Sequence, residues 1–171
     1  MTQTLNASRP AFGYAALLTI GMVVTIGGAL CFQYIGGYTP CELCLLQRQP
    51  YYYGIPVAIL AALSALLRLP VWLTRGLLAI AGILMVVGGG IGVYHAGVEW
   101  NFWEGPSSCT GPAFDGTAPA SGGVLGSLNK VHGPSCSVAA LRVLGVSMAG
   151  WNVIASVILA AIAVIGLRKT A

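Results

Sequence analysis

The stretch from Gly76 to Val98 reads GLLAIAGILMVVGGGIGVYHAGV and has no charged side chain over its 23 residues. A helix that crosses the hydrocarbon core of a bilayer needs about 20 consecutive, mostly apolar residues, so this stretch is long enough to span a membrane. The same property recurs along the chain. Three further uncharged runs of at least 19 residues occupy positions 10–41, 49–67 and 143–167.

The composition excludes the other broad classes of protein. Of the 171 residues, 57% are hydrophobic and 7% are charged, and the mean hydropathy is +0.84. About a quarter of the residues of a soluble domain are charged, and disordered chains are rich in charge and poor in apolar residues. The net charge of +4 provides too few cations for a nucleic-acid groove, so we expect no nucleic-acid partner. The sequence therefore predicts an integral membrane protein embedded in the lipid bilayer.

We expect an all-α bundle of four transmembrane helices that forms a single membrane domain over residues 1–171. The apolar stretch that starts at Ala11 is longer than the ~7–15 residues of a signal-peptide core, so we expect it to be a retained span. Within the last connection, residues 138–147 (VAALRVLGVS) are expected to form a short helix in the membrane interface. The predicted helices cover approximately residues 11–34, 49–67, 73–94 and 147–167, and the two longer connections cover approximately 35–48 and 95–146.

The distribution of basic residues predicts how the bundle is oriented. The segments 1–9, 68–75 and 168–171 carry five Lys or Arg in 21 positions, whereas the opposite face carries three in 66 positions. Basic residues concentrate on the cytoplasmic side of membranes. We therefore expect both termini in the cytoplasm and both longer loops on the outer side.

Four of the five cysteines lie on these two outer loops, where an oxidising compartment permits disulfides. Cys41 and Cys44 form a Cys-x-x-Cys motif, which occurs in redox pairs and in zinc sites. Cys109 and Cys136 bracket 26 residues rich in Gly, Ser and Pro. Because four-cysteine zinc sites more usually combine two closely spaced pairs, we expect no metal. Two structural disulfides remain an open alternative to redox chemistry.

Arg48 favours the redox interpretation. It follows Cys44 by four residues, and residues at this spacing share one face of a helix. A neighbouring cation favours the thiolate, which is the reactive form of cysteine. If Pro50 starts the second helix, the two side chains lose this strict spacing but remain neighbours. Cys31, near the outer end of the first predicted helix, is expected to have a structural role only.

The run PCELCLLQR at residues 40–48, at the outer edge of a predicted four-span protein, resembles the disulfide bond formation protein B (DsbB) family. The later loop cysteines and the sequence MAGW at 148–151 extend the resemblance over essentially the whole chain. The resemblance implies a protein-thiol:quinone oxidoreductase in the bacterial inner membrane. Such an enzyme reoxidises a periplasmic DsbA-like thiol oxidase and passes the electrons to ubiquinone or menaquinone.

The resemblance also implies a role for each loop cysteine. Cys109 and Cys136 match the shuttle disulfide that exchanges with the DsbA-like partner. Cys41 and Cys44 match the pair that the quinone oxidises, with Cys44 next to the quinone ring. Electrons would therefore pass from the later loop to the Cys-x-x-Cys motif.

Two further residues match family positions near the quinone. Arg48 matches an arginine that interacts with the quinone, and His95, at the outer end of the third predicted helix, matches a nearby histidine. From the sequence alone, His95 is equally consistent with a plain interfacial residue.

Two alternative functions stay open at this point. Vitamin K epoxide reductase-like proteins also combine a helical bundle with a Cys-x-x-Cys motif near a quinone. In them the loop cysteines precede the motif, whereas here they follow it, so the order favours DsbB. The other alternative is a non-catalytic membrane protein with two structural disulfides.

Overall fold

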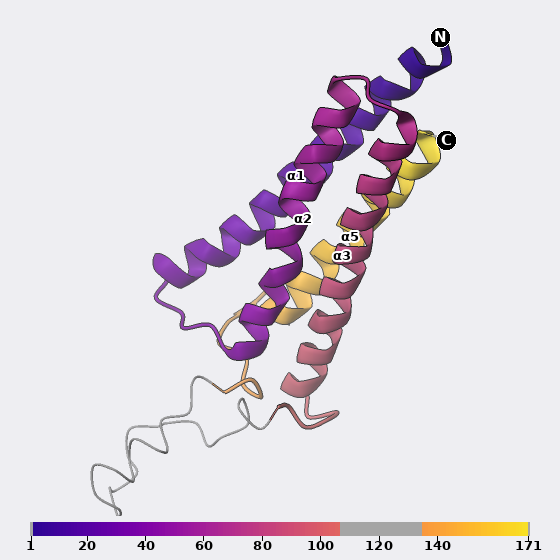
Figure 1. Cartoon of the computed structure of the whole chain (residues 1–171). Coiled ribbons are helices and arrows are strands. Elements are labelled where there is room, and N and C mark those ends of the chain that lie inside the picture. The colour runs from indigo at the N-terminus through magenta and orange to yellow at the C-terminus, as the bar shows by residue number, and fades with distance from the viewer. Residues whose placement is uncertain (1, 107–134, 171) are drawn as a thin grey trace, which may run out of the picture.

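The computed structural model describes residues 2–106 and 135–170. Over this part of the chain the protein is helical apart from one short antiparallel hairpin (Figure 1). Of the cysteines singled out above, Cys109 lies outside the described residues. The elements are α1 (Thr2–Tyr34), α2 (Glu42–Leu66), α3 (Val71–Glu99), β1 (Arg142–Val143), β2 (Val146–Ser147) and α5 (Met148–Lys169).

The four long helices pack as a bundle in which each helix has two main neighbours. α3 packs along α2 and α5, and α1 packs along the same two helices, so α1 and α3 lie diagonally across the bundle. Figure 1 shows the start of α1, the end of α5 and the short α2–α3 connection at one end. The α1–α2 connection, the end of α3 and the hairpin lie at the other end. The cysteines of the Cys-x-x-Cys motif are at this second end.

Small side chains allow the helices to approach closely. The centre of the bundle combines alanines from all four helices with a few larger residues such as Leu18, Met22 and Met85. Small residues have the same role between helices of membrane proteins in general, because they let the backbones come near. At Gly92 a Cβ atom would lie 2.8 Å from Val153 Cγ2 and 3.2 Å from Asn152 Nδ2. Gly92 is therefore one place where α3 and α5 need a residue without a side chain.

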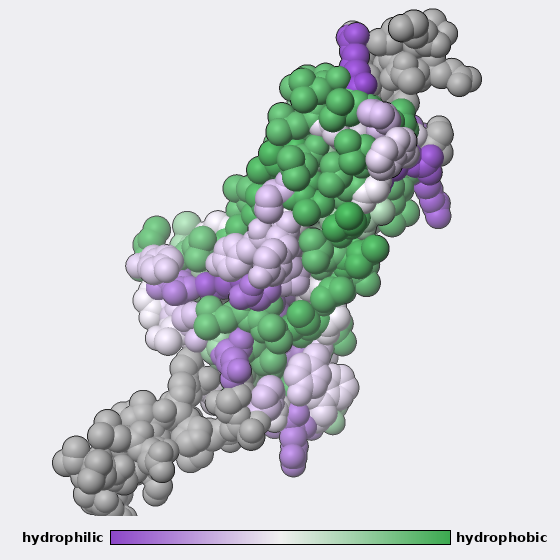
Figure 2. Space-filling view, viewed as in Figure 1, coloured by the Kyte–Doolittle hydropathy of each residue, from purple (hydrophilic) through white to green (hydrophobic). Residues whose placement is uncertain are grey.

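The outer surface of the bundle is apolar as well. Val24, Ile83 and Val157 are 61–67% exposed, and Figure 2 shows hydrophobic residues covering much of the visible face, with hydrophilic ones mainly toward the two ends. A helix that is hydrophobic on all sides belongs in a membrane or in the core of a large protein. Within residues 2–106 and 135–170, three helical segments are long and apolar enough to cross a membrane: Pro10–Tyr34, Val71–Glu99 and Met148–Lys169. The chain is therefore a multi-pass membrane protein.

The predicted start of the second helix is wrong. α2 begins at Glu42 rather than near residue 49, and Pro50 lies inside it. Cys41 caps the helix, since its Sγ accepts a hydrogen bond from the Cys44 backbone N–H at 3.3 Å. The turn before Pro50 is retained because Leu43 and Gln47 are buried against the rest of the protein.

The third helix also extends beyond its predicted end. It runs to Glu99 rather than residue 94, so that His95 and Glu99 occupy one helical face four residues apart. Val98 and Glu99 are buried at the end of α3, and this packing stabilises an additional helical turn. The sequence did not indicate this turn, because Glu99 is a charged residue.

The interfacial helix expected over residues 138–147 is not present. The segment instead forms the β1–β2 hairpin, with Leu144 and Gly145 at φ values of 53° and 80°. Two consecutive residues with positive φ form the tight turn that suits a two-residue hairpin and cannot continue a helix. The indole N–H of Trp151 donates to the Val143 carbonyl at 3.0 Å and joins the hairpin to the first turn of α5.

Candidate functional site

The Cys-x-x-Cys pair lies at the N-terminal end of α2. The Sγ atoms of Cys41 and Cys44 are 2.8 Å apart, and both residues are free thiols in this structure. Cys41 is buried, and Cys44 is partly buried. The N-terminal end of a helix carries a partial positive charge, which stabilises a nearby thiolate. The local fold therefore prepares this pair for thiol chemistry.

The two thiols differ in acidity, and both precede the uncharged run at 49–67. The hydrogen bond from Cys41 lowers the pKa of Cys44 to about 7, and the charge of Arg48 acts in the same direction, whereas burial opposes both. The same hydrogen bond and burial raise the pKa of Cys41. Cys44 is therefore the first of the two to ionise, and Cys41 keeps the proton that it donates to Cys44.

Cys136 packs directly against this pair. It is completely buried in a cluster with Cys41, Leu43 and Val98. Its Sγ, the Cys41 Sγ and a ring nitrogen of His95 all lie within 4.8 Å of one another. Cys136 is itself disulfide-bonded. Three such ligands could hold a metal only if every cysteine were a free thiolate, so the arrangement is better suited to disulfide exchange.

His95 lies in the interior of the site with both ring nitrogens in contact with polar groups. Its Nε2 is 3.6 Å from the Cys41 Sγ and 3.8 Å from the Glu99 Oε1. Its Nδ1 is 2.5 Å from the Gln47 Nε2. The ring also makes a hydrogen bond with the backbone of Cys136. His95 is therefore a buried contact of the cysteine pair rather than a headgroup residue.

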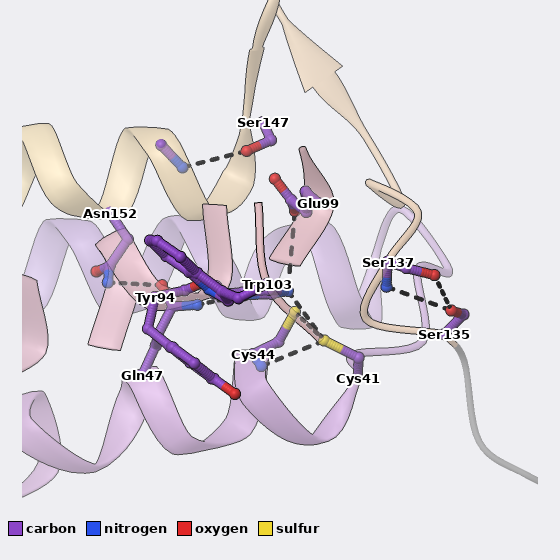
Figure 3. Close-up of polar contacts among 12 residues, drawn as sticks. Cys41, Cys44, Gln47, Tyr94, Glu99, Trp103, Ser135, Ser137, Ser147 and Asn152 are labelled. Carbon is purple, nitrogen blue, oxygen red and sulfur yellow. Dashed lines mark hydrogen bonds and ion pairs between the residues drawn. The ribbon is translucent and has the colours of Figure 1, made fainter. Parts of the chain in front are cut away.

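A row of hydrogen bonds continues from His95 into the bundle. Gln47 Oε1 accepts from the Asn152 Nδ2 at 2.7 Å, and the Asn152 Oδ1 accepts from the Tyr51 hydroxyl at 2.8 Å. The Tyr51 hydroxyl is also 3.1 Å from the Ser156 Oγ. Figure 3 shows Gln47 and Asn152 between α2 and α5, to one side of Cys41 and Cys44. We call these residues with His95 the interior network: Gln47, Tyr51, His95, Asn152 and Ser156.

Glu99 lies on the other side of His95. It is 8% exposed, and its Oε2 has no hydrogen-bond partner in the described part of the chain. The Ser147 hydroxyl interacts with this carboxylate and also caps α5 by accepting from the Gly150 N–H. Glu99 therefore joins the end of α3 to the start of α5 and places an acceptor beside the histidine.

Arg48 is held from the first helix. Its Nη1 donates a hydrogen bond to the Gln33 Oε1. Because glutamine is neutral, this contact orients the guanidinium without cancelling its charge, which remains available to Cys44. Both residues line a cavity of about 420 Å³ between α1, α2, the start of α5 and the segment 135–143. Cys44, Phe32 and Trp151 line the same cavity.

The comparison with known families decides what kind of protein this site belongs to. The family described as disulfide bond formation protein DsbB matches residues 11–166. This chain belongs to the DsbB family. Membership identifies it as a membrane oxidoreductase that forms disulfide bonds, and it favours DsbB over the vitamin K epoxide reductase-like alternative.

Individual DsbB relatives show the extent of the similarity. Disulfide bond formation protein B 1 of Pseudomonas fluorescens (strain Pf0-1) is 32% identical over 152 residues, which cover 85% of this chain and 82% of that protein. The Burkholderia ambifaria protein (strain AMMD) is 31% identical over 159 residues, covering 86% and 85%. The Ralstonia nicotianae protein (strain GMI1000) is 39% identical over 95 residues, covering 55% and 54%. No solved structure matches this chain significantly.

The structure of this DsbB-family chain brings together most of the residues singled out from the sequence. Cys41, Cys44, Cys136 and His95 meet at one end of the bundle, and Arg48 lines the adjoining cavity. Sequence reasoning missed the polar residues that surround them. A signal was present for Gln33, Tyr51 and Asn152, since polar side chains inside apolar runs are costly unless they have partners. The missed residues are Gln33, Gln47, Tyr51, Glu99 and Asn152.

Proposed function

We propose that this protein reoxidises a DsbA-like thiol oxidase and passes the electrons through two cysteine pairs to a membrane quinone, either ubiquinone or menaquinone. The observation that carries the proposal is the position of Cys136, a disulfide-bonded cysteine whose Sγ lies within 4.8 Å of the Cys41 Sγ. A thiolate released at Cys136 would need only a small movement to attack Cys41. Two disulfides with purely structural roles would not need to lie in contact.

The relay begins with two thiol–disulfide exchanges. A thiolate of the partner attacks Cys109 and forms a mixed disulfide, and Cys136 leaves as a thiolate. Cys136 then attacks the Cys41 Sγ, the Cys41–Cys44 bond breaks, and Cys44 leaves as a thiolate. Each exchange forms one S–S bond and breaks another, so it changes no net oxidation state. The positive end of α2 and the charge of Arg48 stabilise Cys44 as the leaving group.

The cavity beside Cys44 has the chemistry that a quinone needs. Its volume of about 420 Å³ is within the range of small-molecule sites, and its walls include Phe32 and Trp151. Arg48 would donate hydrogen bonds to a quinone carbonyl, and Gln33 would keep the guanidinium in place. When bound, a quinone supplies an acceptor for two electrons and two protons. Cys44 is the residue from which the electron pair leaves, after which the Cys41–Cys44 disulfide forms again.

Helix packing and the distribution of charge support the proposed topology. α2 packs along α1 and α3, two of the helices that are apolar enough to span a membrane (Figure 1). We therefore take the uncharged part of α2, after Arg48, as a fourth span, with the charge distribution supporting both termini in the cytoplasm and the site at the periplasmic face. The membrane is then the bacterial inner membrane.

Thiol labelling in intact cells tests this orientation. After reduction, a maleimide that does not cross the inner membrane should label Cys109 in a variant that retains no other cysteine. Lys169→Cys, at the far end of α5 in an otherwise cysteine-free protein, is the matched control and should react only after lysis. The reverse pattern of labelling would contradict the proposed topology.

A coupled assay with purified protein tests the proposed function. The protein in detergent should reduce ubiquinone-1 or menadione when it is supplied with a reduced DsbA-like protein, and one quinone should be consumed for each partner disulfide formed. Without either substrate no reaction is expected. Partner oxidation that proceeds equally well without quinone under anaerobic conditions would contradict the proposal.

A further inference from the structure

The interior network has a defined hydrogen-bond direction. The Gly88 carbonyl can only accept a hydrogen bond, and the group that faces it at 3.4 Å is the Asn152 Nδ2. The same amide nitrogen faces the Gln47 Oε1, and the Tyr51 hydroxyl donates to the Asn152 Oδ1. With its oxygen facing Asn152, Gln47 has its own amide nitrogen toward His95.

This direction determines which ring nitrogen of His95 carries the proton. An amide nitrogen is only a donor, so the Nδ1 that faces Gln47 must be the acceptor and the hydrogen must be on Nε2. The surroundings of Nε2 agree, since it faces the Cys41 Sγ at 3.6 Å and the Glu99 Oε1 at 3.8 Å, and both atoms can accept. The hydrogen bond between the ring and the Cys136 backbone also needs a ring N–H, because a carbonyl only accepts. The two ends of the network, Gly88 and Glu99, thus independently favour the same orientation.

Resting on the function proposed above, we propose that Gln47 and Asn152 are positioning residues that hold His95 as its Nε2–H tautomer, with that hydrogen on the side of the ring that faces the Cys41 sulfur and the Cys136 backbone. In this form His95 is a hydrogen-bond donor to Cys41 and not a base. Its Nδ1 lone pair is occupied by Gln47, so the ring can accept a proton only if the network breaks.

A donor at the Cys41 sulfur is useful at one step of the relay. The second thiolate of the partner breaks the mixed disulfide, so that the partner leaves with its own disulfide and Cys109 is released as a thiolate. To reset the relay, this Cys109 thiolate attacks Cys136 in the Cys41–Cys136 disulfide. The Cys109–Cys136 bond forms, the Cys136–Cys41 bond breaks, and Cys41 leaves with the electron pair as a thiolate. Cys41 is otherwise a poor thiolate, because burial and its hydrogen bond to Cys44 raise its pKa. The His95 Nε2–H would stabilise the negative charge at the sulfur where it develops.

The tautomer can be observed directly by ¹⁵N NMR of histidine-labelled protein. The chain has two histidines, so a His132→Asn background leaves only the His95 signals. With no other substitution in this background, we expect the hydrogen of His95 to be on Nε2.

Substitutions in the network should move this hydrogen. The carboxylate introduced by Asn152→Asp cannot donate to Gln47, so the Gln47 amide should reverse and His95 should change to Nδ1–H. Gln47→Glu should cause the same change by accepting directly from Nδ1. Ser64→Ala, which removes a buried hydrogen bond to Thr74 elsewhere in the bundle, is the matched control and should leave the tautomer unchanged.

The consequence for Cys41 is measured on a protein in which the other four cysteines are replaced by serine. Alkylation of its single thiol by iodoacetamide reports the thiolate fraction as pH is varied. Loss of a hydrogen bond to a charged group lowers an equilibrium by about tenfold or more, so Asn152→Asp should slow alkylation at neutral pH by about tenfold and shift its profile to higher pH.

Neither measurement uses a quinone or a partner protein, so both remain informative if the proposed function fails. The network's role in selecting the tautomer would be overturned by either of two results. One is an Nδ1–H tautomer in the natural sequence, and the other is a tautomer that stays the same in both Asn152→Asp and Gln47→Glu. A reversed tautomer with unchanged alkylation would overturn its effect on Cys41. A reversed tautomer with slower alkylation supports the proposal.

Discussion

Replacement of Cys109 by serine is expected to abolish oxidation of the DsbA-like partner while the Cys41–Cys44 pair remains oxidisable by added quinone. The partner loses the disulfide that it attacks, so no electrons enter the relay, whereas the thiols beside the cavity are unchanged. The expected effect is the loss of all partner turnover above background. It is measured as the rate of partner disulfide formation in the coupled assay, alongside direct oxidation of the reduced variant by ubiquinone-1.

A structural role for the cysteines predicts a different result. Removal of one disulfide that only closes a loop would lower thermal stability by about 2–5 kcal/mol and leave electron transfer intact. Cys31→Ser is the matched control, because Cys31 is a free, exposed thiol on α1 and has no place in the relay. Partner turnover at the natural rate in Cys109→Ser would contradict the relay.

The second large effect is expected at Arg48. Arg48→Met removes both the charge beside Cys44 and the donors that would hold a quinone carbonyl. Loss of a charge-assisted hydrogen bond is worth ~1.5–3 kcal/mol, which corresponds to about tenfold to hundredfold in binding. The apparent KM for quinone should rise by this factor. Arg48→Lys should have a smaller effect, because it keeps the charge but loses the planar set of donors.

The acidity of Cys44 provides a second measurement on the same variants. The charge of Arg48 lowers the pKa of Cys44, so its removal in Arg48→Met should raise that pKa and reduce the thiolate fraction at neutral pH. The acid limb of the pH–rate profile, where the rate rises as the thiol ionises, would then move to higher pH, and it should move little in Arg48→Lys. Gln33→Leu keeps the charge but releases the guanidinium, so it should raise the KM without this shift.

The control for Arg48 is another arginine of the bundle. Arg75→Met removes a positive charge from the start of α3, at the end of the bundle opposite to the site (Figure 1). It should leave both the KM and the pH profile unchanged. Natural quinone kinetics in Arg48→Met would show that Arg48 only anchors the chain in the headgroup region.

The sequence alone predicted the all-helical membrane fold, because the absence of charge over about 20 residues is a local property that can be counted. The first and last residues of the helices were harder to predict from the sequence. Pro50 indicated a helix start, yet the burial of Leu43 and Gln47 retains the preceding turns and begins α2 at Glu42. This outcome preserves the spacing of Cys44 and Arg48 that the sequence could suggest only conditionally.

The residues that carry the chemistry could also be recognised in the sequence. The side chains that they contact in the fold could not. A cysteine motif followed by an arginine indicates reactive thiols by its spacing, but nothing local connects Cys136 with Cys41, Gln33 with Arg48, or Asn152 with Gln47. Each of these contacts joins different parts of the fold and depends on how far each helix is rotated and shifted along its neighbour. Close packing of small residues such as Gly92 sets that rotation and shift. The sequence therefore determined which side chains are costly to bury, and only the tertiary structure decided which partners satisfy them.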